Sequence, residues 1–321
     1  MTDESSHFEL SVLLVTYNHE LYIERALDSL FSQDFSGAIE LVVADDASSD
    51  ATLKRIQRYE GRDARFTFKY LSPVANLGIT RNYQRGFSAC LGRYVAVLEG
   101  DDYWSSPYKL TRQARFLDQH WECGLCSVNY FVFNEDDASF VSRVKRSDGY
   151  RLLTARDLIS DNLVGNFSTC LYRKSALETL PAELFDITSY DWIVNICVAR
   201  NSLIGFIEEP MSVYRVHSRG AWSNVARIEQ LEQQLSLIPE YDQLTRQLFH
   251  ASFAKLQRRL RKAVLLSRRG QSLGTVARAL AWSATNLEQF IPPVVVIVLK
   301  GLTPPVVKKI FLKIIRRGGG I

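Results

Sequence analysis

Three polar clusters in the chain contain residues that could bind a metal ion together with a phosphate-bearing ligand. They are Thr16–Asn18, Asp45–Asp46 and Glu99–Asp102. A hard cation such as Mg²⁺ or Mn²⁺ takes few protein carboxylates and fills its coordination shell with water and phosphate oxygens. Asp101 and Asp102, with Asp46 nearby, therefore suggest a metal–diphosphate site. One such cluster by itself would be read as a helix cap or a solvated turn; two of them favour a functional site.

Each cluster follows a short apolar run that predicts a buried strand. The runs are Ser11–Thr16, Ile39–Ala44 and Tyr94–Leu98, and helical apolar spacing over His19–Gln33 and Ile79–Cys90 lies between them. Strands that alternate with helices predict an α/β fold with βαβ units and a largely parallel sheet. Ligands of such sheets bind beyond the carboxyl ends of the strands. We therefore expect the three clusters to meet at one edge of the sheet.

Composition excludes several classes of protein. The 321 residues are 46% hydrophobic and 23% charged, which rules out a disordered chain and leaves room for one large domain or two. The five cysteines are an odd number, so a disulfide-stapled scaffold is not expected, and their pattern suits a reducing compartment. The first residues show no signal-peptide pattern, and no apolar run is as long as a membrane-spanning helix. We expect a cytoplasmic protein.

Charge divides the chain into two regions. Residues 226–321 carry 16 Lys and Arg against 5 Asp and Glu, whereas residues 1–225 are net acidic. We expect a catalytic α/β domain over 1–225 and a basic, α-helical region over 226–321. Aromatic residues are too few among the basic ones to favour nucleic-acid binding. The basic region suits peripheral contact with the anionic inner face of the cell membrane, or it packs on protein, including a second copy in a homo-oligomer.

The motifs of the first region resemble those of a known family. VLLVTYNHELYIERALDSLFSQ, VVADDASSDAT and NLGITRNYQRGFSACLGRYVAVLEGDDYW resemble the nucleotide-sugar half of family 2 glycosyltransferases with the GT-A fold, densely over residues 10–120 and more thinly to about 220. The resemblance implies an inverting transferase that uses a nucleotide-diphosphate sugar, most often a UDP-sugar, and Mn²⁺ or Mg²⁺. The acceptor would be a hydroxyl of a glycan or lipid-linked glycan in bacterial-type surface polysaccharide synthesis.

The resemblance also implies which residues bind the donor. Thr16, Tyr17 and Asn18 would line the nucleoside pocket, Asp46 would contact the base or the ribose, and Arg81 would lie near the base or the diphosphate.

The acidic motif of the family reads Glu99-Gly100-Asp101-Asp102 in this chain, so the first carboxylate of its D-x-D pattern is a Glu. Glu99 is therefore expected to be structural or to support the ligands. We rank Asp102 as the direct metal ligand and Asp101 as a sugar or ribose contact.

Two later motifs complete the expected site. Ser189-Tyr190-Asp191-Trp192 resembles the acidic motif that opens a helix in related transferases, so Asp191 would take the proton of the acceptor hydroxyl. The same residue would also serve as an ordinary helix cap. Tyr214-Arg215-Val216-His217 resembles the Y-R-x-H element that closes over the diphosphate or metal. It implies that Arg215 binds phosphate and that His217 binds the metal.

Two other functions compete with this one; the first stays open, and the second is discounted. A catalytically silent, sugar-nucleotide-binding scaffold of a glycan assembly complex would keep the fold, but it would be expected to lose Asp102 or Asp191, and both are present. A sugar nucleotidylyltransferase would need a glycine-rich loop after the first strand, and Thr16–Glu20 contains no glycine.

Overall fold

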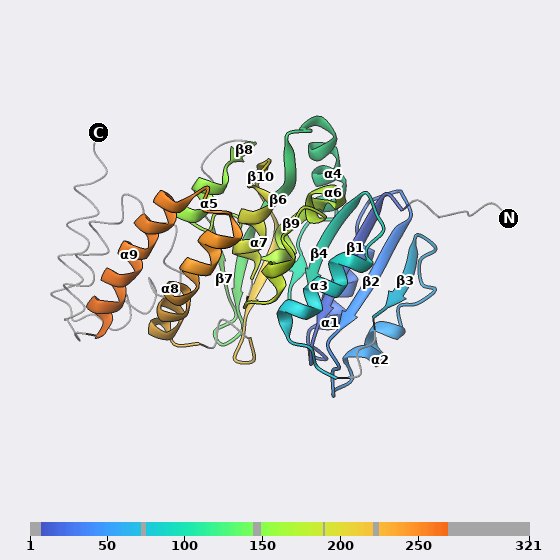
Figure 1. The fold of residues 1–321 in the computed structure, drawn as a ribbon. Coiled ribbons are helices and arrows are strands. Elements are labelled where there is room, and N and C mark those ends of the chain that lie inside the picture. Colours follow the sequence, from blue (N-terminus) through green and yellow to red (C-terminus); the bar gives the residue numbers. More distant parts are fainter. Residues whose placement is uncertain (1–7, 72–74, 144–148, 189, 221–224, 269–321) are drawn as a thin grey trace, which may run out of the picture. The chain divides into compact units, whose positions relative to one another are not determined.

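A computed structural model describes residues 8–71, 75–143, 149–188, 190–220 and 225–268 of the chain. These residues form a mixed sheet with the strand order β3-β2-β1-β4-β9-β6-β10-β5 (Figure 1). The strands in this order are β3 (Phe66–Tyr70), β2 (Ile39–Asp45), β1 (Leu10–Thr16), β4 (Tyr94–Glu99), β9 (Cys170–Arg173), β6 (Cys123–Asn134), β10 (Leu203–Val216) and β5 (Tyr103–Trp104). Two short strands pair outside this order: β7 (Ser139–Ser142) with β6, and β8 (Tyr150–Leu153) with β10.

The first half of the sheet is parallel, as the sequence predicts. Strand β1 pairs with β2 on one side and β4 on the other, and β2 pairs with β3, all in parallel register. Every residue of β1 and β2 is buried. Helices cover both faces of such a sheet, and this is why its strands appear in the sequence as continuous apolar runs rather than as alternating ones.

The second half departs from the predicted parallel pattern. Strand β9 enters between β4 and β6 and is antiparallel to both, while β6 and β10 are parallel to each other. Strand β5 pairs antiparallel with the carboxyl-terminal part of β10. This pairing places residues that are more than a hundred positions apart in the chain next to the end of β4.

Helices connect the strands of the sheet. They are α1 (Ile23–Phe31), α2 (Thr52–Gln57), α3 (Ile79–Ala89), α4 (Lys109–Gln119), α5 (Ala155–Ser160), α6 (Lys174–Leu177) and α7 (Asp191–Val198), with 3-10 turns at Phe167–Thr169 and Ala182–Phe185. Helix α1 illustrates how they pack. Its Ile23, Leu27 and Leu30 recur at intervals of three or four, and all are fully buried in the core.

The chain divides into two compact units. The first contains residues up to Val225 together with Leu237–Ala254, and the second contains Ala226–Ser236 and the residues from Lys255 onward. Helices α8 (Arg227–Leu244) and α9 (His250–Arg268) each contribute to both. The domain division predicted at 225/226 stays a prediction.

The basic region is described as far as Arg268. Helix α9 carries six Lys and Arg and no Asp or Glu. None of the helices in the described ranges is both long enough and apolar enough to cross a bilayer. Residues 269–321 lie outside the described residues, so the predicted membrane or oligomer contact of region 226–321 stays a prediction.

A lysine lies in the core of the first unit. Lys109, the first residue of α4, has no exposed surface, and its Nζ lies 4.3 Å from the centroid of the Trp104 ring without a hydrogen-bond partner among the described residues. Burial lowers the pKa of Lys109 to about 7. Trp104 is itself almost fully buried and donates its indole N–H to the carbonyl of Ser168.

We predict that Lys109 makes the stability of the protein depend on pH. Between pH 7 and pH 10 the unfolded chain binds a proton at this lysine that the folded protein does not bind, so the free energy of unfolding rises with pH. Urea unfolding should give wild type about 2 kcal/mol more stability at pH 9 than at pH 7, relative to Lys109→Met measured in parallel. Equal pH dependence of the two proteins would contradict a neutral buried Lys109.

Candidate active site

The polar clusters do meet at the carboxyl ends of the parallel strands. The backbone N–H of Asp46 donates to the carbonyl of Thr16 at the end of β1, at 2.9 Å. The N–H of Gly100, just after β4, donates to the carbonyl of Val15, also at 2.9 Å. A side chain at Gly100 would come within 2.8 Å of Thr16 Oγ1 and His19 Nδ1, so this turn needs a glycine.

The loop after β1 is fastened to the loop after β2. The N–H of Asn18 donates to Ser48 Oγ at 2.9 Å, and Asn18 Oδ1 accepts from the N–H of Ser49 at 2.8 Å. Asn18 has a φ of 54°, a left-handed conformation that Asn tolerates better than most residues. Thr16 is buried, whereas Tyr17 is 47% exposed. Of these three residues, Tyr17 has the most surface to offer a ligand, while Asn18 shapes the loop.

Asp46 is buried and fixes the entry to α3. Its carboxylate accepts from the N–H groups of Leu77 and Gly78, at 2.8 and 2.9 Å. Both oxygens are thus already hydrogen-bonded to backbone, immediately before the helix that carries Arg81.

Arg81 lies exposed in the first turn of α3. It pairs with Asp186 at 2.6 Å and donates to Gln84 at 2.8 Å. Arg85, one turn later, reaches the end of β2 and donates to the carbonyl of Asp45 at 2.7 Å. Sequence reasoning did not single out Arg85, although its place one helical turn beyond Arg81 was a usable signal.

The two aspartates after β4 have different surroundings. Asp102 is 1% exposed, and its two oxygens accept from the N–H of Arg215 and from Asn166 Nδ2, both at 2.9 Å. Burial and the neighbouring Asp101 charge raise the pKa of Asp102 well above its usual range.

Asp101 lies against two imidazoles. Its Oδ2 is 3.1 Å from His217 Nε2 and 3.7 Å from His19 Nε2. Burial acts to raise the pKa of Asp101, but the hydrogen bond from His217 and the charges of the two histidines outweigh it, so the pKa is lowered. The structure therefore brings His217 to Asp101 and not to Asp102, the aspartate that the resemblance ranks as the metal ligand.

His19 is a site residue that sequence reasoning missed. It lies in the loop between β1 and α1, and burial lowers its pKa. Its carboxylate partner, Asp101, belongs to the turn after β4, about eighty positions along the chain, and the residue pattern around position 19 does not name that partner.

Arg215 lies among aromatic rings, next to the turn formed by Glu99–Asp102, which we call the acidic turn. Its Nε donates to the carbonyl of Asp101 at 2.9 Å, and its side chain is 9% exposed. The guanidinium carbon is 5.0, 5.7 and 5.3 Å from the ring centroids of Tyr22, Tyr103 and Phe133. In this geometry Arg215 holds the turn, and the diphosphate contact that the resemblance implies for it stays a prediction.

Glu99, the last residue of β4, accepts from the hydroxyl of Tyr83 at 2.8 Å. Burial and the charges of Asp102 and Asp101 raise the pKa of Glu99 well above its usual range. Its surroundings therefore favour a neutral carboxyl with a structural role at the start of the turn.

Asp191 is the first residue of α7, at the amino-terminal end of that helix. Its Oδ2 lies 3.5 Å from Asn162 Nδ2, and burial raises the pKa of Asp191 to about 7. The neighbouring Trp192 is buried and donates its indole N–H to the carbonyl of Leu158 at 2.7 Å. Asn162 belongs to the same short segment as Asn166, so one segment reaches both Asp191 and Asp102.

A divalent cation fits part of this donor set. Within the described ranges, no cluster of three or more His, Cys, Asp or Glu is arranged to hold a metal. Asp101 and His217 would nevertheless offer one oxygen and one nitrogen ligand side by side. A cation bound by two protein groups would take its remaining ligands from water and a diphosphate.

Comparison with known proteins identifies the class. The family model of glycosyl transferase family 2 matches residues 11–180, just over half of the chain. The chain therefore belongs to glycosyl transferase family 2.

Curated relatives share this region. The uncharacterized protein Rv1520 of Mycobacterium tuberculosis (strain ATCC 25618 / H37Rv) is 34% identical over 216 residues, covering 66% of this chain and 60% of that protein. TuaG of Bacillus subtilis (strain 168), a glycosyltransferase whose name assigns it to teichuronic acid biosynthesis, is 27% identical over 165 residues, covering 51% of this chain and 62% of that protein. The chain thus spans about 60% of the length of these relatives.

Solved structures show the same fold. S. aureus TarS 1-349 in complex with UDP-GlcNAc superposes with a TM-score of 0.56 at 20% identity, covering 77% of this chain and 73% of that chain. The mannosyltransferase PcManGT from Pyrobaculum calidifontis, in complex with GDP-Man and Mn²⁺, gives 0.56 at 19% identity, covering 88% and 81%. The α/β fold expected from the motifs, the GT-A fold, is confirmed.

We predict that Arg215 stabilises the whole acidic turn. Arg215→Ala removes a charged hydrogen bond to the carbonyl of Asp101 and the packing of three rings, so it should lower the free energy of unfolding by about 2 kcal/mol in urea titrations. Arg112→Ala, which removes an exposed ion pair with Glu209, is the matched control and should cost less than about 1 kcal/mol. Equal effects would show that Arg215 is an ordinary surface arginine.

Proposed function

We propose that this protein is a metal-dependent, inverting glycosyltransferase. It would move a hexose or N-acetylhexosamine from a nucleotide-diphosphate sugar to a hydroxyl of a glycan or lipid-linked acceptor in surface polysaccharide synthesis. The observation that carries the proposal is that one short segment, residues 162–166, hydrogen-bonds to two acidic sites. Asn166 reaches Asp102 on the side of the acidic turn, and Asn162 reaches Asp191 at the start of α7.

The donor would lie over the loops that follow β1 and β2. Tyr17 offers an exposed ring for stacking on a base, and Thr16 and Asn18 give that loop its shape. Asp46 would contact the base or ribose beyond the two backbone N–H groups that it already accepts. Arg81 would reach the base or diphosphate by exchanging Asp186 for the ligand.

UDP is the nucleotide that we propose for the donor, because TarS of S. aureus has the same fold and was solved with UDP-GlcNAc. The acceptor class is supported by the name of TuaG, which refers to teichuronic acid biosynthesis.

The metal would be held by Asp101 and His217, and Asp102 would not be a ligand. A bound Mn²⁺ or Mg²⁺ would offset the negative charge of the departing nucleoside diphosphate. PcManGT, which shares the fold, was solved with Mn²⁺. We favour Asp101 over Asp102 as the carboxylate ligand, because both oxygens of Asp102 already accept hydrogen bonds from protein groups. Asp102 would keep the turn rigid.

Asp191 would act as the general base. Its carboxylate takes the proton of the acceptor hydroxyl while that oxygen bonds to the anomeric carbon. The bond from that carbon to the diphosphate breaks at the opposite side, so the configuration inverts. A pKa of about 7 leaves much of Asp191 ionised at neutral pH and able to accept a proton. Asn162, as a donor to Asp191 Oδ2, favours the ionised form.

Asp191→Asn tests this role. The variant should bind UDP as wild type does, since Asp191 is not placed on the donor, but its transfer rate should fall by at least about a hundredfold. The wild-type rate should rise with pH through about 7, because only the ionised carboxylate accepts the proton. Glu183→Gln, an exposed acidic residue in the Ala182–Phe185 turn, is the control. Near-normal transfer by Asp191→Asn would require another base, and no transfer by wild type with any donor would favour a silent scaffold.

Metal dependence is tested by the melting temperature with UDP in the presence of Mn²⁺ or EDTA. A ligand that binds the folded protein raises the melting temperature by mass action, so wild type should show a shift that EDTA abolishes. Asp101→Asn should lose that shift. Asp102→Asn should keep it but melt lower even without ligand, since an amide there faces the donor group of Asn166. The reverse pattern would return the ligand role to Asp102.

A further inference from the structure

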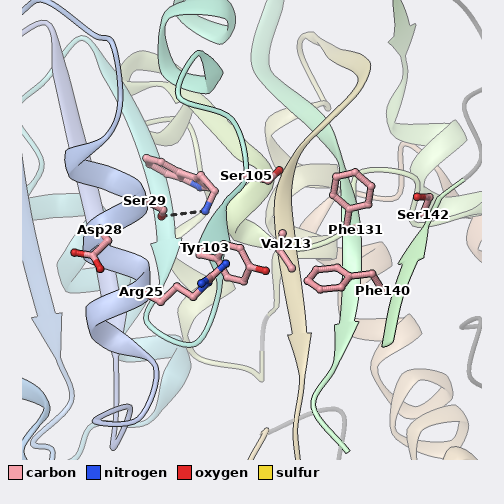
Figure 2. Close-up of a pocket in the computed structure, with 10 residues that line it drawn as sticks. Arg25, Asp28, Ser29, Tyr103, Ser105, Phe131, Phe140, Ser142 and Val213 are labelled. Atoms are coloured by element: carbon pink, nitrogen blue, oxygen red, sulfur yellow. Dashed lines mark hydrogen bonds between the residues drawn. The ribbon is translucent and has the colours of Figure 1, made fainter. Parts of the chain in front are cut away.

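A groove of about 590 Å³ lies on the α1 side of the sheet, apart from the residues assigned to the donor and the base (Figure 2). Helix α1, the β5 segment, β6, β7 and β10 all contribute side chains to it. Figure 2 shows Arg25 beside Tyr103, with Phe131 and Phe140 beyond Val213. The volume falls within the range of about 300–1,000 Å³ that is typical of small-molecule sites.

Aromatic rings form much of the groove. Tyr103 and Trp104 are almost fully buried, whereas Phe140 is 58% exposed. Phe140 packs on Phe133 with the ring centroids 4.6 Å apart. A ring held by a neighbour on one side and open on the other offers a flat apolar surface to a ligand.

Polar groups around these rings remain available for a ligand. The guanidinium of Arg25 stacks 4.2 Å from the centroid of the Tyr103 ring, and this side chain makes no hydrogen bond or ion pair to another described residue. Asp28 Oδ1 accepts a hydrogen bond from the hydroxyl of Tyr59, which leaves Oδ2 as an acceptor for a ligand. The hydroxyls of Ser105 and Ser142 add groups that both donate and accept.

This lining decides between classes of ligand. One cation and one anion line the groove, so it carries no net charge to attract a phosphate or another ion. A hydrocarbon chain would cover both charges without hydrogen-bonding to them, which is costly. A neutral molecule with apolar faces and hydroxyls around its edge satisfies the rings and the polar groups together. Sugar rings have this chemistry.

We propose that this groove binds an uncharged saccharide. Tyr103 connects it to the active site, since this residue follows Asp102 directly and its ring is near two guanidinium groups, Arg25 at 4.2 Å and Arg215 at 5.7 Å. Saccharide in the groove would therefore lie close to the acidic turn, with Tyr103 as a shared neighbour. Resting on the proposed function, we assign it to a part of the acceptor glycan remote from the reacting hydroxyl.

The test measures saccharide binding without nucleotide or metal, so it does not depend on transfer. Saturation-transfer NMR with neutral hexose and N-acetylhexosamine tetrasaccharides should detect binding to the full-length protein. Phe140→Ala should weaken it about tenfold, and Arg25→Gln, a change at an exposed helix position, gives a second variant that keeps the fold. Trp121→Ala removes a ring that is 85% exposed and is not part of the groove; it is the matched control and should bind as wild type does.

Several outcomes would overturn the assignment. They are no binding of any tetrasaccharide, binding that neither groove variant changes, and loss of the saccharide signal to a polyprenol added in mild detergent. Asp191→Asn separates this inference from the proposed function, because it should stop transfer and leave groove binding intact. If Phe140→Ala weakens saccharide binding but the wild-type protein has no transfer activity, the groove assignment stands and the proposed transferase function is refuted.

Discussion

The constraint on which the site depends is the gathering of carboxylates at the end of one buried strand. Glu99, Asp101 and Asp102 lie within four residues, and Asp191 is close enough to raise the pKa of Glu99 further. Like charges in a poorly solvated place repel strongly unless they are neutralised or hydrogen-bonded. In this fold, protein groups make hydrogen bonds to the carboxylates and so reduce the repulsion. They are the hydroxyl of Tyr83, the N–H of Arg215, the Asn166 amide and the imidazole of His217. They come from α3, from the segment before the Phe167–Thr169 turn and from the end of β10, so the site forms only when these distant parts of the chain have come together.

This explains why the sequence predicted one half of the site better than the other. The strands β1, β2 and β4 appear as apolar runs, and in parallel sheets the ends of such strands share an edge. The place of Asp46 and of the acidic turn therefore followed from local patterns. The insertion of antiparallel β9 and the return of β10 beside β5 depend on pairing between distant segments. No local pattern reports such pairing, so the partner Asn166 was missed.

Arg215 shows the limit of reasoning from residue type. An arginine in a motif near a diphosphate site is naturally expected to bind phosphate, since its planar fork suits that geometry. Here three rings from distant parts of the chain lie around it, and its Nε donates to the carbonyl of Asp101. Residue type does not reveal this second task, holding the turn, and the phosphate contact stays a prediction beside it. The burial of the Arg215 side chain is a property of the assembled sheet.

The aromatic wall around Arg215 also links the two sites of the molecule. The Tyr103 ring packs near both Arg25 and Arg215, and the Phe133 ring packs near both Arg215 and Phe140. The same rings thus pack against the support of the acidic turn and shape the groove beside α1. A ligand that contacts Phe140 or Arg25 would therefore touch residues that pack on the same rings as Arg215. Because Arg215 donates to the carbonyl of Asp101, these packing contacts would let a ligand in the groove act on the acidic turn.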